Sequence, residues 1–440
     1  MYITKKDTWE YVIGLEVHAQ ILSNTKLFSR SKNNSNDSAN NNVDILDFAT
    51  PGTLPVLNIE CVKKAIAAGL ALNGNIAKIS QFDRKNYFYP DLPKGYQISQ
   101  FYHPIIRNGY VSITINGIEK KINIDRAHIE EDAGKSMHDK HSRYTLIDLN
   151  RAGVGLLEIV SCPEIKSPEE AVEYCKALRK ILMYAGVNDG NLEDGSFRCD
   201  ANVSVRKKGD LKLGTRREIK NLNSFTSLLK AIEYEGNWQV ETLENGGTIE
   251  QSTLLFDITT NETKVMRDKE NANDYRYFPD PDLPKLVIDD KLIQSIALTM
   301  PELPYVKKNR YISEYNLSEY DAEILTSTIQ IAIFFEEIIS KANCSPKLAS
   351  NWITTEVFAA LKEYNQDLTS YLDNQNKNST QQIGSNNNLE SNNNQIFDDA
   401  NNDEKIKKLH ISTEQIIDLM KLIESGAISG KLAKEIFKII

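Results

Sequence analysis

A carboxylate and a histidine stand two positions apart in a stretch where polar and apolar residues alternate. The segment Tyr11–Ile21 has mainly apolar side chains at every second position, which indicates a strand with one buried face. Glu16 and His18 therefore project together from its other face. Carboxylates beside an imidazole can hold a hard divalent cation such as Mg²⁺, which bridges phosphate oxygens. The alternative for any one such pair is a solvated strand face.

More carboxylates are found in stretches that could join the same site. Arg198–Arg206 repeats the alternation, and Asp200 lies on its polar face. Further acidic residues lie between these two predicted strands, namely Glu130, Glu131, Asp132 and Glu158, with His128 just before the first of them. Each alone is unremarkable as a surface group. Jointly they predict a divalent-cation site if the fold brings them together.

The segment Phe82–Gln100 has the densest mixture of aromatic, basic and turn-forming residues in the chain. Its cations could meet phosphates, and its rings could stack on single-stranded bases. The cations are Arg84, Lys85 and Lys94, and the rings include Tyr87, Phe88, Tyr89 and Tyr96. The alternative interpretation is a well-packed aromatic loop. The stretch Asn273–Pro284 has a similar composition and could equally be a rigid proline turn.

Familiar nucleotide and hydrolase motifs do not account for the chain. Ala133-Gly134-Lys135-Ser136 resembles the end of a phosphate-binding loop, but Ile129 stands where the leading glycine belongs. The sequence has no GxGxxG after a strand, no HExxH and no GxSxG. It also lacks a glycine- and serine-rich amidase stretch, so ammonia released from an amide would have to come from another protein.

Composition and charge limit the partners, metal sites and cellular locations that the chain can have. The 440 residues carry a net charge of −9, so a nucleic-acid partner needs a local basic patch or help from a second protein. None of the five cysteines forms a CxxC pair, which argues against a cysteine zinc site and a disulfide framework. No apolar run approaches the roughly 20 residues of a membrane span, and the start lacks a signal-peptide core. We expect a cytoplasmic protein.

The placement of Gly, Asn and Pro residues and the periodicity of the apolar residues predict an α+β fold with a largely antiparallel sheet, followed by helices. Serines at 167, 224, 318, 345, 412 and 429 each precede a helical pattern and are candidate N-caps. We predict a catalytic domain over residues 1–295 and a helical domain over 296–372. An Asn-rich disordered insertion is expected over 373–408, and the start of a tail domain over 409–440.

Several long strings, taken in order, resemble one family. They include IGLEVHAQI, FDRKNYFYPDLPKGYQISQ, HIEEDAGKSMH, DLNRAGVGLLEIVS, DGNLEDGSFRCDANVSVR and DYRYFPDPDLP. Together they are similar to the B subunits of bacterial tRNA-dependent amidotransferases, from Val12 to about Leu286. The resemblance implies a cradle domain related to glutamine synthetase, a helical domain and a tail that touches tRNA. It also implies A and C partner subunits, with A supplying ammonia from glutamine.

The resemblance further implies the reaction and its residues. ATP and Mg²⁺ would phosphorylate Glu on tRNA(Gln) or Asp on tRNA(Asn), and ammonia would then displace the phosphate. The family pattern assigns metal binding to Glu16, His18, Glu131, Glu158 and Asp200. It assigns catalytic contacts to Lys85, Lys94, Arg198 and Asn202, and we expect Arg84, Tyr87, Tyr89 and Tyr96 at the tRNA 3′ end. The sequence does not decide between the two mischarged tRNAs.

Two departures from the family pattern stand out. Many relatives have two cysteine pairs before PGTLP, whereas LFSRSKNNSNDSANNNVDILDFATPG has none, so we predict no zinc and a loop held by packing alone. The family tail also extends past Ile440, so we expect this chain to lack the end of that domain. The shortened tail keeps an inactive scaffold subunit as an alternative, and a stand-alone carboxylate–amine ligase is a second alternative.

Overall fold

A computed structural model describes residues 8–364 except 35, 139 and 269–271, together with 368, 371, 372 and 411–439. The predicted Asn-rich insertion at 373–408 lies outside the described residues. The chain divides into two compact units, Met1–Pro301 and Glu302–Ile440. Within the described part of the chain, no helix is both long and apolar enough to cross a membrane.

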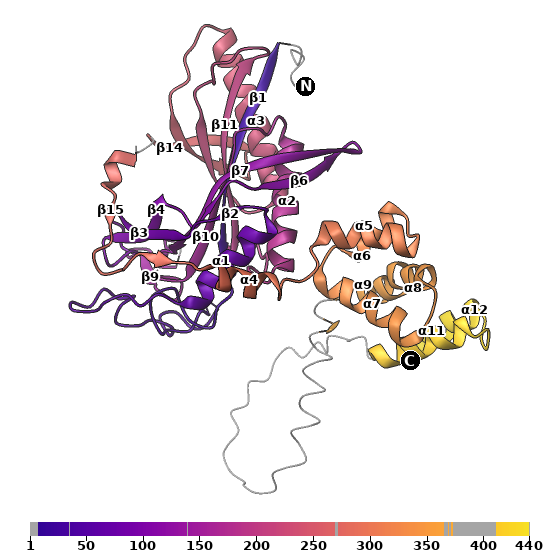
Figure 1. Ribbon diagram of the computed structural model, residues 1–440. Helices are drawn as coiled ribbons and strands as arrows, with labels where there is room; N and C mark the ends of the chain where they lie inside the picture. Colours follow the sequence, from indigo (N-terminus) through magenta and orange to yellow (C-terminus); the bar gives the residue numbers. More distant parts are fainter. Residues whose placement is uncertain are drawn as a thin grey trace, which may run out of the picture. The chain divides into compact units, whose positions relative to one another are not determined.

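A mixed sheet forms the centre of the first unit (Figure 1). Its order is β14-β13-β12-β11-β1-β10-β7-β5-β2, with β6 beside β7, and every pair is antiparallel except β12 with β13. The strands are β1 (Trp9–Gln20), β2 (Asn75–Ile76), β5 (Ile106–Arg107), β6 (Tyr110–Ile115), β7 (Ile118–Glu131), β10 (Gly155–Ser161), β11 (Phe197–Lys207), β12 (Arg217–Leu222), β13 (Ser252–Asp257) and β14 (Glu262–Asp268). The expected α+β class with a largely antiparallel sheet is confirmed.

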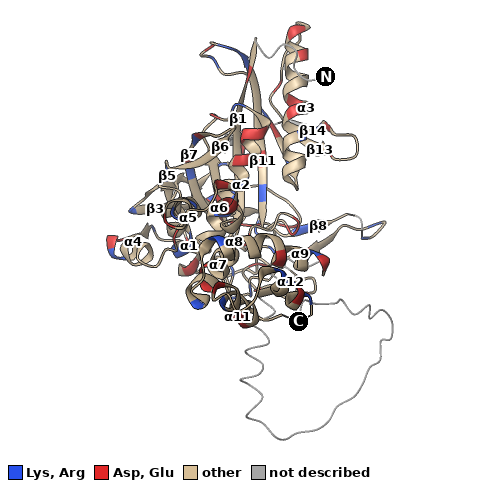
Figure 2. Ribbon diagram, turned by 90° about the vertical axis from the view of Figure 1, so that its right-hand side faces the viewer, with Lys and Arg blue, Asp and Glu red and all other residues tan. Residues whose placement is uncertain are grey.

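Helices cover the apolar face of this sheet. They are α1 (Ile59–Ala71), α2 (Pro168–Tyr184) and α3 (Phe225–Glu244), with a further helix, α4 (Asp290–Ala297), against α1. Ile13, Leu15 and Val17 of β1 are fully buried on the face toward the helices. Ser167 and Ser224 cap α2 and α3 as predicted, each accepting a bond from a first-turn N–H. Acidic residues lie along α3, in keeping with the negative net charge (Figure 2).

A smaller sheet lies against β7. It contains β3 (Ile79–Asn86), β4 (Tyr96–His103), β15 (Phe278–Pro279) and β16 (Leu286–Val287), while β8 (Lys135–Met137) and β9 (Leu146–Asp148) form a separate hairpin. The two segments singled out for their aromatic and basic residues thus become neighbouring strands. Phe278 pairs with Arg84, and Lys85 pairs with Gln97. A short 3₁₀ helix, Ala272–Tyr275, leads into β15.

The cysteine-free loop before α1 is held by a buried ion pair, so the expectation that packing alone holds it is wrong. Lys26 is fully buried, and its Nζ lies 2.9 Å from Oδ2 of Asp47 and 3.2 Å from the carbonyl of Leu149. Gly153, at φ +82°, lets the chain approach this pair, since a Cβ there would lie 2.7 Å from Asp47 Oδ1. A buried charge persists only when it is paired, which explains why the two residues occur together.

The second unit is helical. Its elements are α5 (Pro304–Tyr315), α6 (Glu319–Leu325), α7 (Ile329–Ala342), α8 (Pro346–Trp352), a π-helical turn (Ile353–Val357), α9 (Phe358–Glu363), α11 (Thr413–Glu424) and α12 (Gly430–Ile439). Ser318, Ser345 and Ser412 are N-caps as predicted, and Ser412 forms a full capping box with Gln415. Phe334, Phe335, Trp352 and Met420 are among the buried side chains of its core.

Candidate active site

The face of the central sheet away from the helices carries the predicted polar residues. Register explains how distant segments converge, because Glu16 pairs with Asp200, and His18 pairs with both Glu158 and Arg198. Glu158 in turn lies opposite His128 on β7. Side chains two apart on a strand share a face, so five adjacent strands contribute to one polar surface. These strands are β12, β11, β1, β10 and β7.

Two histidines and two carboxylates meet at the centre of this surface. His18 Nε2 lies 3.4 Å from Glu158 Oε2 and 4.0 Å from Glu130 Oε1. His128 Nε2 lies 3.5 Å from Glu158 Oε2 and 3.7 Å from Glu130 Oε2. One donor atom each from His18, Glu130 and Glu158 falls within 4.8 Å of the other two. The fold thus brings the predicted histidine together with carboxylates from two other strands.

The electrostatics of the cluster favour positive charge. Burial alone would lower the pKa of His18, but the hydrogen bond to Glu158 and the charges of Glu158, Glu130 and Asp200 raise it to about 9. Burial would raise the pKa of Glu158, yet the charge of His128, the bond from His18 and the charges of His18 and Lys85 hold it well below its usual value. A cation at this point would take over the role of these protons.

Glu131 does not join the cluster. It follows Glu130 directly on β7, so the two side chains take opposite sides of the strand. Lys94 Nζ lies 2.6 Å from Glu131 Oε2, and the Ile98 N–H donates to Oε1 at 2.9 Å. Burial raises the pKa of Glu131, and Lys94 only partly offsets it. A metal-binding role for Glu131 stays a prediction that this geometry does not favour, and Glu130 takes its place among the candidates.

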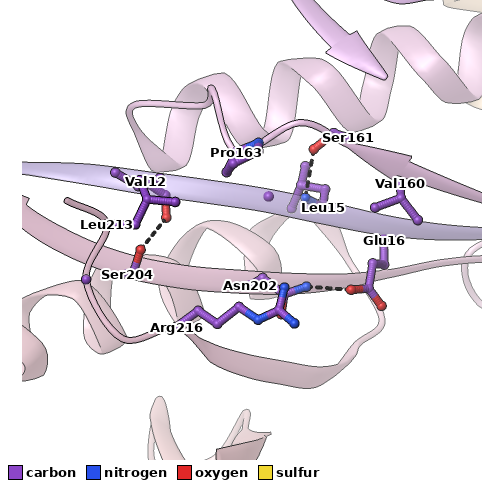
Figure 3. A pocket seen from close by; sticks show the side chains of 12 residues that line it. Val12, Leu15, Glu16, Val160, Ser161, Pro163, Asn202, Ser204, Leu213 and Arg216 are labelled. Carbon is purple, nitrogen blue, oxygen red and sulfur yellow. Dashed lines mark hydrogen bonds between the residues drawn. The ribbon is translucent and has the colours of Figure 1, made fainter. Parts of the chain in front are cut away.

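The remaining predicted carboxylates form a second acidic group next to the first. Asn202 Nδ2 donates to Glu16 Oε1 at 2.8 Å, and Figure 3 shows Arg216 beside this pair at the wall of a cavity of about 160 Å³. Burial and the charges of Glu158, Glu218 and Asp200 raise the pKa of Glu16. Carboxylates crowded in this way resist ionisation together unless a cation joins them.

A larger cavity of about 400 Å³ opens over the histidine–carboxylate cluster. His18, Glu130, Glu158 and Asp200 line it together with the predicted Lys85 and Arg198. The guanidinium of Arg198 lies 3.1 Å from Asp132, and Arg198 and Arg151 overcome burial to hold the pKa of Asp132 below its usual value. Pockets for small ligands commonly measure roughly 300–1,000 Å³, so this cavity is of the right size.

The aromatic segment forms a wall near this cavity rather than a set of free rings. Arg84 bonds to Asp280 at 2.9 Å and to Asp282 at 2.7 Å, and its guanidinium stacks 4.2 Å from the centre of the Tyr96 ring. Tyr87 donates to Gln97 at 3.1 Å and is partly buried. Tyr89 is 49% exposed, and Phe88 is 80% exposed. Among Tyr87, Tyr89 and Tyr96, the rings assigned to the tRNA 3′ end, Tyr89 is thus the most accessible, and the neighbouring Phe88 is more exposed still.

The residues present fit a divalent cation. An imidazole and two carboxylates with donor atoms within 4.8 Å of each other supply a mixed nitrogen–oxygen set. Buried Nδ1 of His128 and Oδ1 of Asn202 have no hydrogen-bond partner among the described residues, so each leaves one polar contact unfilled near the site. Oxygen-rich surroundings favour Mg²⁺ or Mn²⁺ over softer metals.

The family pattern left four residues of this surface out of the assigned site, although two of them, His128 and Glu130, stand in the acidic stretch that the sequence singled out. The other two are Glu218 and Lys220. His128-Ile129-Glu130 has the same two-residue spacing as Glu16-Val17-His18, and applying that rule would have selected Glu130 over Glu131. Glu218 and Lys220 lie in the polar run GTRREIKNLNSF, which offers no clear apolar alternation to set a face.

Two protein-family models match most of the chain. Residues 11–294 match the GatB/GatE catalytic domain, and residues 333–440 match the GatB domain. The B subunit of the aspartyl/glutamyl-tRNA(Asn/Gln) amidotransferase of Orientia tsutsugamushi (strain Ikeda) is 50% identical over 435 residues, covering 99% of this chain and 81% of that protein. The corresponding protein of Rickettsia felis is 49% identical over 433 residues, with 98% and 81% covered.

The catalytic domain that bears the polar sheet face is thus of the GatB/GatE type. The chain belongs to the family of amidotransferase B subunits, which are parts of glutamine-dependent carbon–nitrogen ligases.

Proposed function

We propose that this chain uses ATP and Mg²⁺ to activate the side-chain carboxylate of Glu on tRNA(Gln), or of Asp on tRNA(Asn), for conversion to the amide. The observation that carries the proposal is the convergence of His18, Glu130 and Glu158 in a cavity that also contains Lys85 and Arg198. The names of the relatives supply the substrate class, an aminoacyl-tRNA.

The chemistry explains why such a site is needed. A carboxylate is a poor acyl donor because its oxygen is a poor leaving group, and transfer of the γ-phosphoryl group from ATP makes an acyl phosphate. Ammonia then attacks the carbonyl carbon, phosphate leaves with its bonding electron pair, and the proton lost by the nitrogen is taken up by the released phosphate, which gives the amide. Bound Mg²⁺ would neutralise charge on the phosphate oxygens during the first step.

The residues divide this work by position. His18, Glu130 and Glu158 would hold the cation, and Glu16 with Asp200 would lie beside it on the neighbouring strands. Lys85 faces the same cavity and can bind phosphate oxygens through its ammonium group. Asp132 orients Arg198 at 3.1 Å through one guanidinium nitrogen, and the other N–H groups of that guanidinium would polarise the acyl group.

Partner proteins complete the proposal. The relatives are named as subunits, so we place this chain in a complex with an ammonia-supplying A subunit and a C subunit. We propose that the first unit has the cradle fold related to glutamine synthetase, and that the helical unit with the tail contacts tRNA in the cytoplasm. The exposed rings of Phe88 and Tyr89 would lie where the 3′ end of the tRNA enters.

The test is His18→Ala in the reconstituted three-subunit complex. Loss of a ligand should lower amide formation and tRNA-dependent ATP consumption by about 100-fold or more, since even changes around metal ligands cost about 10–100-fold. Glutamine hydrolysis by the A subunit should persist. His141→Ala, an exposed histidine on the β8–β9 hairpin, is the matched control. Wild-type ATP consumption by His18→Ala would refute the assignment.

A further inference from the structure

Lys220 lies at the β12 edge of the polar sheet face, although no motif in its sequence marks it. It lies on β12, two residues after Glu218, so both side chains project to the same side of the strand. Its Nζ lies 2.6 Å from Asp200 Oδ2 and 2.8 Å from Glu218 Oε1. Lys220 also lines the 400 Å³ cavity that contains His18 and Glu158.

Lys220 is paired with two carboxylates, but its side chain stays partly accessible to solvent. Its side chain is 35% exposed, whereas those of Asp200 and Glu218 are 14% and 10% exposed. The carboxylates are thus fixed in the wall, and the flexible four-carbon arm reaches them from the side of the cavity. A small movement of this arm would bring the ammonium group into the cavity without disturbing the sheet.

Charge explains why the lysine rests where it does. Glu16, Asp200 and Glu218 lie close enough for their charges to act on one another, and burial with this repulsion raises the pKa of Glu16. Burial would lower the pKa of Lys220, but Asp200 and Glu218 raise it, so the group stays an ammonium ion at neutral pH. Its single positive charge is shared between two carboxylates and leaves the group of three acids with net negative charge.

A divalent cation and an ammonium ion would compete for these oxygens. Mg²⁺ carries twice the charge and prefers carboxylate oxygens, whereas a lysine ammonium also binds phosphate well. When a nucleotide binds with its cation, the cation is the stronger partner for the carboxylates, and the phosphate groups are a new partner for the lysine.

We propose that Lys220 is an internal counter-ion that holds Asp200 and Glu218 in the nucleotide-free protein and moves to the phosphate oxygens of the nucleotide when a divalent cation takes over the carboxylates. The proposal rests on the proposed function and adds a phosphate-binding residue to it. Lys220 forms no covalent bond and loses no proton in this exchange. Its role is to keep the acidic face assembled before ligands arrive and to bind the nucleotide afterwards.

The experiment compares Lys220→Met with wild type in the reconstituted complex, using Mn²⁺ as the probe. Without nucleotide, the variant should bind Mn²⁺ about tenfold more tightly, because a competing charged interaction has been removed. With nucleotide, its KM for ATP should rise about tenfold, because a phosphate contact is lost. A purely structural role would weaken Mn²⁺ binding or leave it unchanged.

Two further variants make the test decisive. Lys220→Arg keeps the charge and should bind Mn²⁺ as wild type does, which shows that charge rather than chain length sets the affinity. Lys264→Met removes a lysine from the exposed one-to-one pair with Asp257, 2.6 Å apart, and should change neither quantity. If Lys220→Met unfolds, Lys220→Arg with weakened Mn²⁺ binding by itself supports a structural role and overturns the proposal.

Failure of this inference can be told from failure of the proposed function. If Glu158→Gln leaves Mn²⁺ binding at its wild-type strength, the cation site itself is wrongly assigned. If Glu158→Gln abolishes binding while Lys220→Met does not tighten it, the cation site stands and only the counter-ion role of Lys220 is overturned.

Discussion

Charged side chains are arranged differently on the sheet face of the first unit and in the helical unit. In the helical unit, Glu302 and Glu336 face Lys307 and Arg310, with Arg310 Nη2 2.6 Å from Glu302 and Lys307 Nζ 2.8 Å from Glu336. Acids and bases are equal in number there, so each group is neutralised within the cluster.

On the sheet face the acids are paired differently, because Glu130 and Glu158 contact histidines and Glu16 accepts a hydrogen bond from Asn202. The carboxylates at the candidate site are Glu16, Glu130, Glu158, Asp200 and Glu218, and Lys220 is paired directly with the last two of them. His18, whose pKa is raised to about 9, is charged at neutral pH, and Lys85 and Arg198 line the same cavity. Acids matched to lysine and arginine stabilise a fold, whereas carboxylates that face histidines in a cavity can exchange those protons for an external cation. The contrast therefore separates structural ion pairs from a binding site without reference to any relative.

The strongest challenge to this contrast is the pair of variants Glu130→Gln and Glu131→Gln. The two positions are adjacent in sequence, but only Glu130 faces His18. We expect Glu130→Gln to weaken Mn²⁺ binding by about 100-fold, as loss of a direct ligand should exceed the roughly 10–100-fold cost of a change around one. Glu131→Gln should retain Mn²⁺ binding. Equal losses in a titration followed by electron paramagnetic resonance would place both carboxylates in the site.

A second prediction concerns a pair that is balanced and also buried. Lys26→Met leaves Asp47 without its cation in the interior, which should lower the free energy of unfolding by about 3–5 kcal/mol. Urea unfolding of the isolated chain measures this change. Lys63→Met, which removes an exposed partner of Glu60, should cost at most about 1 kcal/mol. A similar small cost for both would mean that the loop does not depend on the buried pair.

Glu16→Gln should raise the free energy of unfolding, whereas Lys26→Met should lower it. Because burial and neighbouring carboxylates raise the pKa of Glu16, its charge at neutral pH destabilises the folded state, and removing it should stabilise the free chain by about 1 kcal/mol. The amide keeps the shape of the side chain and can still meet Asn202. A loss of stability in thermal unfolding would show that the acidic face is already neutralised.

The smallest effect is expected at Glu302. Its hydrogen bond from Arg310, against a smaller opposing effect of burial, lowers its pKa from 4.5 to about 2. A carboxylate whose pKa is lower in the folded than in the unfolded state stabilises the fold at pH values above its unfolded-state pKa. This contribution is therefore present at pH 7 and is lost as pH falls from about 4.5 through about 2. Glu302→Gln should cost about 1 kcal/mol or less at pH 7. The difference from wild type should shrink at pH 3, and a constant difference would contradict the ion-pair explanation.

Local patterns predicted the elements well and their relative placement less well. The alternating segments Tyr11–Ile21 and Arg198–Arg206 correspond to β1 and β11 in the structure. They could be predicted because the alternation of a strand involves only neighbouring residues. The choice between Glu130 and Glu131 depends on the phase of β7, which pairing with β10 fixes from outside the motif.

Ion pairs between residues far apart in the sequence could not be predicted, because they too depend on how the strands and loops are placed. Lys26 finds Asp47 across a loop, and Lys220 finds Asp200 from the next strand of the sheet, and neither spacing has a local signature. Burial of a charge can be recognised only once the surrounding chain is placed. Arg84 likewise was expected to meet tRNA, but Asp280 and Asp282 already bind it in the free chain, and its contact with tRNA stays a prediction.

The central place of β1 has a consequence for biosynthesis. This strand leaves the ribosome well before its two neighbours, β10 and β11, are translated. During that interval its two edges and its apolar face have no native partner, and such exposed strands invite pairing with other nascent chains. We therefore expect this early part of the polypeptide to be especially open to pairing with other chains until β11 emerges.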